Sequence, residues 1–122
     1  MLSRPPISLS QAHLGEIALR RVPVPAYERA RLDPRIVHVG VGGFHRAHLA
    51  LYLDDLAARG GTWGVVGLGL LPHDAAMADA LRPQDFLYTL IEKGRGEPSA
   101  RVVGTITGFV HAPVFLSQMP GS

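Results

Sequence analysis

The sequence of 122 residues contains no cysteine, which excludes disulfide bridges, thiolate metal sites and cysteine nucleophiles and fits a reducing compartment. It contains a single lysine, Lys93, so arginine supplies nearly all of the positive charge. These arginines are scattered along the chain, and the formal net charge is only +2. Because nucleic-acid binding needs a concentrated basic surface, the composition indicates no nucleic-acid partner.

Long apolar runs are also missing from the sequence. The longest, "WGVVGLGLLP" at residues 63–72, is interrupted by glycines and is about half as long as the roughly 20 residues of a membrane-spanning helix. The N-terminal stretch "MLSRPPISLSQ" has no apolar block of the length found in signal peptides. We therefore expect a soluble, cytoplasmic protein that does not enter a membrane.

What the chain does contain is an alternation of apolar runs and amphipathic segments, at a hydrophobic content of 47% that suits one domain. Apolar runs at residues 36–39, 64–70 and 86–92 predict three strands. The order βαβαβ predicts an α/β fold with a right-handed, doubly wound, Rossmann-like parallel sheet. The glycine-rich "KGRGEPS" then joins the third strand to a long β-rich segment at residues 101–111, which adds an antiparallel hairpin strand.

The two helices of this pattern are predicted at residues 44–59 and from Pro72 or Asp74 to just before Pro83. In the first, an apolar stripe with helical spacing is expected to face the core, with Asp54 and Asp55 off the stripe; its members are Leu49, Tyr52, Leu53 and Leu56. In the second, the side chains expected to face inward are Met77, Ala78 and Leu81.

We divide the chain into an N-terminal arm at residues 1–34, a partial Rossmann-type domain at 35–113 and a divergent tail at 114–122. The arm is rich in proline and is expected to be irregular, with one short helix around residues 11–21. No internal repeat is visible in any of the three segments.

The turn "GVGGFH" between the first strand and the first helix has the features of a phosphate-binding turn. Gly40 permits a sharp turn, Gly42 lets the backbone approach phosphate oxygens, and the following helix N-terminus offers free N–H groups. The G-x-G-x-x-G pattern would place a third glycine where His45 stands, and Gly43 is an extra glycine. The strand before the turn and the helix after it favour a dinucleotide pyrophosphate site. No G-K-[ST] follows, which argues against a P-loop.

The side chains after the glycines have alternative interpretations. Phe44 either packs between helix and sheet or contacts a ligand, and Arg46 either reaches a phosphate or is solvated. His45 and His48 lie three residues apart on one helix, but two histidines without a nearby acidic ligand are too few for a metal site. We therefore predict no metal ion.

Asp74 is the first carboxylate after the second strand, the region that holds the adenosine ribose in Rossmann-type domains. It lies beyond the usual spacing, and it is equally interpretable as the N-cap of the second helix. No arginine follows the strand closely to bind a 2′-phosphate, so NAD is preferred over NADP.

Four stretches together resemble one known family: "IVHVGVGGFHRAHLALYLDDL", "WGVVGLGLLPHDAAMADAL", "QDFLYTLIEK" and "ARVVGTITGFVHAP". They are similar to the N-terminal domain of the mannitol dehydrogenase family, the polyol-specific long-chain dehydrogenases, over roughly residues 35–113. The resemblance implies metal-independent hydride transfer between NAD and a polyol or keto-sugar of the mannitol/fructose, arabinitol or mannonate/fructuronate type. It identifies residues 36–47 as the NAD-binding turn. The predicted cofactor contacts are Gly40, Val41, Gly42, Gly43, Phe44, His45, Arg46 and Asp74.

The sequence departs from that family in length. Members are several times longer, and their C-terminal domain binds the substrate and carries a lysine base in a K-x-x-x-x-N-x-x-H motif. Lys93 is followed by no N-x-x-H and is expected to be an exposed turn residue. We therefore predict no catalytic residue in this chain, substrate binding only through a missing C-terminal domain, and self-association through an exposed sheet edge. The alternative is a non-catalytic nucleotide-binding or interaction module.

Overall fold

The computed structural model describes residues 5–94 and 96–112. Its helices are α1 (Leu14–Leu19), α2 (Gly43–Ala47), α3 (Leu49–Ala58) and α4 (Asp74–Leu81), and its strands are β1 (Asp33–Val39), β2 (Trp63–Gly69), β3 (Tyr88–Glu92), β4 (Ser99–Val103) and β5 (Ile106–His111). Short 3₁₀ turns lie at Gln11–His13, Arg29–Arg31 and Arg82–Gln84. Within the described part, no helix combines the length and the apolar character needed to span a membrane.

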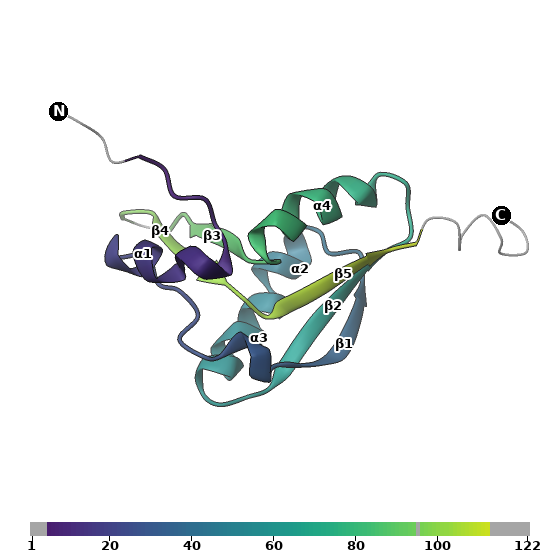
Figure 1. The fold of residues 1–122 in the computed structure, drawn as a ribbon, viewed down its shortest axis with the longest axis horizontal. Helices are drawn as coiled ribbons and strands as arrows, with labels where there is room; N and C mark the ends of the chain where they lie inside the picture. The colour runs from purple at the N-terminus through teal and green to yellow at the C-terminus, as the bar shows by residue number, and fades with distance from the viewer. Residues whose placement is uncertain (1–4, 95, 113–122) are drawn as a thin grey trace, which may run out of the picture.

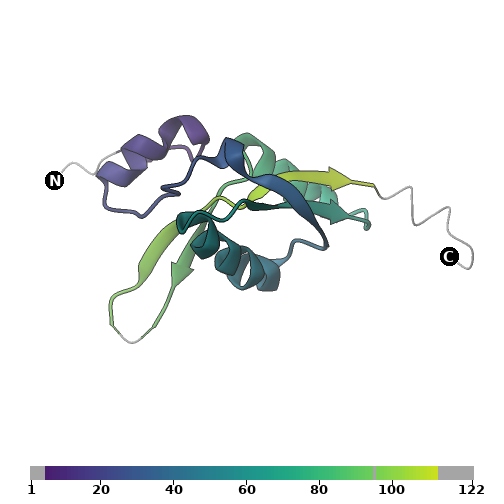
Figure 2. The same ribbon diagram turned by 90° about the horizontal axis from the view of Figure 1, so that it is seen from below.

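A parallel sheet with the strand order β1-β2-β5 forms the centre of the fold (Figure 1). Val37 lies beside Val66 between β1 and β2, and Gly67 lies beside Phe109 between β2 and β5. A separate antiparallel hairpin, β3–β4, projects away from this sheet (Figure 2). The predicted fold class, a Rossmann-like α/β sheet with an added antiparallel hairpin, is confirmed.

The identity of the third parallel strand differs from the prediction. The predicted strand at residues 86–92 is β3, which pairs with β4, and β5 takes the third place in the parallel sheet. The predicted segment 101–111 is therefore two strands, divided at Gly104 and Thr105. At this division side chains replace strand pairing: the Gly104 N–H donates to Asp54, and the Gly104 carbonyl accepts a hydrogen bond from Arg29.

The predicted first helix is also divided. His48 has φ −121° and ψ −81°, outside the helical range, so α2 ends at Ala47 and α3 begins at Leu49. The buried face of α3 is rotated by one residue from the predicted stripe: Tyr52 is 63% exposed, whereas Asp54 is buried. In α4 the prediction is confirmed, because Ala78 and Leu81 are buried and Met77 packs against the core.

The main core lies on one face of the parallel sheet, where α3 and α4 both pack. Its buried members come from the sheet, both helices and the hairpin; they include Ala50, Leu53, Val65, Ala78, Leu81, Tyr88, Val103, Ile106 and Phe109. The side chains of the opposite face remain open, with Val37 and Val110 exposed by more than half. A second, smaller core joins α1 to the hairpin through Leu14, Leu87 and Val102.

Candidate functional site

The chain leaves β1 through a turn that only a glycine accommodates without strain. Gly40 has φ +80°, a left-handed conformation that side-chain-bearing residues rarely adopt. Its N–H donates to the carbonyl of Leu68 at 2.9 Å, which extends the pairing with β2 by one step. Val41 then turns inward and is buried in the core. The turn is therefore anchored to the sheet on both sides of its first glycine.

A cavity of about 430 Å³ opens in front of this turn. It lies at the carboxyl ends of β1 and β2, which is where open α/β sheets bind their ligands. A Cβ atom added to Gly40 or Gly42 would meet no atom within 4 Å, so the main chain of the turn faces open space. The residues that line the cavity are Gly40, Val41, Gly42, His73, Asp74, Ala76, Met77 and Phe109.

Two glycines of β2 hold the walls of this cavity close to the sheet. A Cβ atom on Gly67 would lie 2.4 Å from Cγ2 of Val41, and one on Gly69 would lie 2.5 Å from Cβ of Asp74. Both contacts are impossible for a larger residue without a shift of the wall. In the sequence, these glycines interrupt the longest apolar run, at residues 63–72. Glycine inside an otherwise apolar strand is the signal that indicates such a close approach.

Asp74 lies at the opposite wall, as the first residue of α4. The N-cap position belongs to His73, so Asp74 is not the N-cap. Its Oδ2 accepts a hydrogen bond from the Leu71 N–H at 3.0 Å, and its Oδ1 lies 3.8 Å from Nε2 of His73. The carboxylate is thus held by the loop before α4 while it lines the cavity that the glycine turn also lines.

Arg46 and His45 do not line the cavity. Nε of Arg46 points back to the carbonyl of Gly42 at 3.4 Å, and its guanidinium carbon lies 5.9 Å from the ring centroid of Tyr88. His45 is only 4% exposed and stacks on His38, with ring centroids 3.9 Å apart. Both ring nitrogens of His45 lack a hydrogen-bond partner among the described atoms. Burial, with a smaller contribution from His38, lowers the pKa of His45 to about 4.

The remaining predicted contacts belong to α2. Gly43 is its first residue and Phe44 its second, but the side chain of Phe44 lies outside what the structure describes. Among the described residues, no group of three or more histidine, aspartate or glutamate side chains is placed to hold a metal ion. The structure therefore brings Gly40, Val41, Gly42 and Asp74 together around one cavity, and His45 and Arg46 are not part of its lining.

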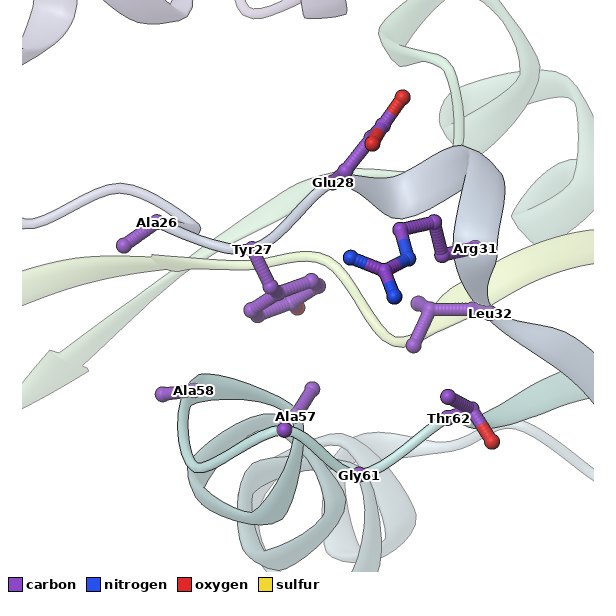
Figure 3. A pocket seen from close by; sticks show the side chains of 10 residues that line it. Ala26, Tyr27, Glu28, Arg31, Leu32, Ala57, Ala58, Gly61 and Thr62 are labelled. Carbon is purple, nitrogen blue, oxygen red and sulfur yellow. The ribbon is translucent and has the colours of Figure 1, made fainter.

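A second pocket, of about 310 Å³, lies at the other end of the sheet, where the arm passes the C-terminus of α3. Figure 3 shows the Arg31 guanidinium between Tyr27 and Leu32, with Glu28 pointing away from the pocket. Leu32 and Thr62 precede β1 and β2 respectively, so this pocket lies at the amino ends of the strands. Ligands of open α/β sheets bind at the carboxyl ends, and the glycine turn therefore marks the more favourable site.

The parallel order of the strands, the glycine turn and the cavity at the carboxyl ends define a Rossmann-type α/β domain. The chain belongs to the mannitol dehydrogenase family, because the model of the mannitol dehydrogenase Rossmann domain matches residues 34–119. The family resemblance found in the sequence is thereby confirmed.

Mannitol 2-dehydrogenases are among the similar curated proteins. That of Pyrenophora tritici-repentis is 51% identical over 98 residues, which are 79% of this chain and 17% of the relative. That of Aspergillus terreus is 48% identical over 114 residues, 88% of this chain and 23% of the relative. The chain thus spans about a fifth of the length of these relatives.

Solved structures show the same fold. The Pseudomonas fluorescens mannitol 2-dehydrogenase, in a ternary complex with NAD and D-mannitol, superposes with a TM-score of 0.81 at 39% identity. The match covers 86% of this chain and 22% of that enzyme. A substrate-free D-sorbitol dehydrogenase superposes with a TM-score of 0.74 at 30% identity.

Proposed function

We propose that this chain binds NAD and is the cofactor-binding portion of an oxidoreductase that acts on a polyol or keto-sugar. The observation that carries the proposal is the cavity lined by both the glycine turn and Asp74, where an added Cβ on Gly40 or Gly42 would meet no atom within 4 Å. A cradle free of side chains is what a pyrophosphate requires for close backbone contact. The similar Pseudomonas enzyme has been solved with NAD bound.

The chain's residues fit this group in distinct ways. The main chain of Gly40, Val41 and Gly42 would hold the pyrophosphate, and the Asp74 carboxylate would accept hydrogen bonds from ribose hydroxyls. The described lining contains this carboxylate and no arginine or lysine, so it favours NAD over a cofactor with a 2′-phosphate. The proposed cofactor-binding segment also includes Gly43, Phe44, His45 and Arg46. When bound, NAD would supply the chemistry of hydride transfer between the cofactor and the carbon of an alcohol or carbonyl group.

The chain does not supply the base that alcohol oxidation needs. The alcohol proton must leave as the hydride departs, and the only lysine, Lys93, is exposed directly after β3, in the connection between β3 and β4. We propose that substrate binding and proton transfer come from polypeptide equivalent to the longer part of the relatives. A cytoplasmic location remains a prediction of the sequence. The alternative function, a non-catalytic nucleotide-binding module, shares the cofactor site but not this second polypeptide.

Calorimetric titration with NAD tests the cofactor assignment. Gly42→Val fills the open space in front of the turn and should abolish binding while the fold, followed by circular dichroism, is retained. Gly15→Val is the matched control, because an added Cβ at Gly15 also meets nothing within 4 Å but lies on α1, away from the cavity. Equal binding by Gly42→Val and the wild type would contradict the assignment.

A turnover assay separates the two functions. With NAD and mannitol, arabinitol or mannonate, the chain alone should give no change in nicotinamide absorbance. Addition of the lysine-bearing remainder of a mannitol 2-dehydrogenase should restore turnover if the chain is a catalytic portion. Turnover by the chain alone would show that a base is present after all.

A further inference from the structure

The break between α2 and α3 leaves the end of α2 in need of hydrogen-bond donors. A helix of five residues cannot satisfy its last carbonyls internally, and the non-helical His48 interrupts the ladder at this point. The carbonyl of Arg46 instead accepts a hydrogen bond from the Tyr88 hydroxyl at 2.5 Å. This contact crosses from the hairpin to the helix of the glycine turn.

Tyr88 is suited to hold that helix in place. It is the first residue of β3, it is 5% exposed, and it belongs to the same core cluster as Val41 of the turn. Its backbone pairs with Val103 of β4, so the ring is fixed by the base of the hairpin. Burial raises the pKa of the phenol, so the hydroxyl remains a donor across the physiological pH range.

A short series of contacts connects Tyr88 to the cavity. Tyr88 binds the Arg46 carbonyl, and the Arg46 guanidinium lies toward the face of the Tyr88 ring. Arg46 in turn donates to the Gly42 carbonyl from its backbone N–H at 3.1 Å and from Nε at 3.4 Å. Gly42 lines the cavity. The carbonyl of this cavity residue is therefore connected to the hairpin through Arg46.

We propose that Tyr88 is a positioning residue of the cofactor site, which fixes the glycine turn for NAD through Arg46. This inference rests on the proposed function. It assigns the inserted hairpin a role in ligand binding, although no described residue of the hairpin lines the cavity in front of the turn. Loss of the hydroxyl leaves the Arg46 carbonyl without this donor and allows the turn to sample other orientations.

The test compares two hydroxyl deletions. Tyr88→Phe should weaken NAD binding about tenfold, the effect of one hydrogen bond on an equilibrium. Tyr27→Phe is the matched control, since its hydroxyl also donates to a partner, Asp54, but Tyr27 lies at the amino ends of the strands. It should lower stability without changing the NAD affinity of the folded protein. Equal losses of affinity in both variants would overturn the inference.

Two further measurements separate positioning from general stability. Site-specific 3-fluorotyrosine at position 88 keeps the ring and the hydroxyl, so it should restore affinity and also report on the site if Tyr88→Phe does not fold. Amide hydrogen exchange of Gly42 and Arg46 should rise in Tyr88→Phe but not in Tyr27→Phe, even without NAD. If the wild type binds no NAD, the proposed function fails, and unchanged exchange at these amides would independently overturn the positioning role.

Discussion

The imidazole rings of His38 and His45 stack beneath the glycine turn, 3.9 Å apart between centroids, with both nitrogens of His45 buried and without a described partner. The pKa of His45 is lowered from 6.5 to about 4, chiefly by burial. The unfolded chain therefore binds a proton at a pH where the folded chain does not. Protonation of His45 in the unfolded chain therefore lowers the free energy of unfolding as the pH falls from 6.5 toward 4. Above pH 6.5 the neutral His45 side chain causes no such loss.

Between pH 7 and pH 4 the His45 contribution to the free energy of unfolding should fall by roughly 3 kcal/mol. His45→Leu should flatten the pH dependence over this range, as measured by urea denaturation at a series of pH values. The same slope in His45→Leu and the wild type would contradict the assignment.

Asp54 joins three segments and should be one of the most sensitive positions of the fold. Its carboxylate accepts hydrogen bonds from the Tyr27 hydroxyl, from Nη2 of Arg101 at 2.5 Å and from the Gly104 N–H at 3.1 Å. Asp54→Asn should lower the free energy of unfolding by about 3 kcal/mol, because a buried ion pair loses one partner. Asp55→Asn also removes a bond to Arg101 but at an exposed carboxylate; it should cost less than about 1 kcal/mol. Comparable losses of unfolding free energy in the two variants would contradict the greater contribution of Asp54 to stability.

Gly67 should tolerate no side chain. Gly67→Ala places a Cβ 2.4 Å from Val41 Cγ2 and 2.7 Å from Phe109 Cδ2. We expect a loss of about 1–3 kcal/mol from overpacking, together with weaker NAD binding as Val41 is displaced. Gly108→Ala in β5 is the control, because its added Cβ would lie 4.0 Å from the nearest atom, Val66 Cγ2. Denaturant titration of both variants decides the point, and equal stability would refute the close approach.

The open face of the parallel sheet should promote self-association at high protein concentration. Val37 is 64% exposed there, and among the described strands β1 has only β2 as a neighbour, which leaves an unpaired edge. Val37→Lys should shift the sedimentation coefficient toward the monomer. Leu19→Lys introduces the same charge at an exposed leucine of α1, outside the sheet, and should have no such effect. A concentration-independent monomer in the wild type would rule out this association.

The sequence predicts best what depends on neighbouring residues. The strand ending at Val39, the left-handed turn at Gly40 and the helix with Ala78 and Leu81 inside each have a local signal in apolar spacing or glycine placement. No local signal shows that β5, and not β3, is the third strand of the parallel sheet. Both segments are apolar, and only their pairing with distant strands distinguishes them. The burial of Asp54 likewise depends on Arg101, 47 residues further along the chain, which no helical periodicity reveals.

The candidate site follows the same division. Gly40 and Gly42 indicate the glycine turn in the sequence, because a strand precedes them and a helix follows. The break at His48 involves neither proline nor glycine, the usual residues at kinks, so no local sequence signal predicts it. No local pattern indicates the role of Tyr88, because its contact with Arg46 spans 42 residues and a buried tyrosine in a strand has the same sequence pattern as other core residues.

The insertion of the hairpin between α4 and β5 also determines when the site is completed during folding. β1, α3 and β2 lie close together in sequence, so their contacts close short loops, whereas β5 must return across α4 and the whole hairpin to reach β2. The entropic cost of closing a loop grows with its length, and contacts between distant segments form more slowly than local ones. Phe109, which forms one wall of the cavity, is carried by this last strand. On a growing chain, the glycine turn is therefore synthesised early but gains its full surroundings only when β5 has joined the sheet.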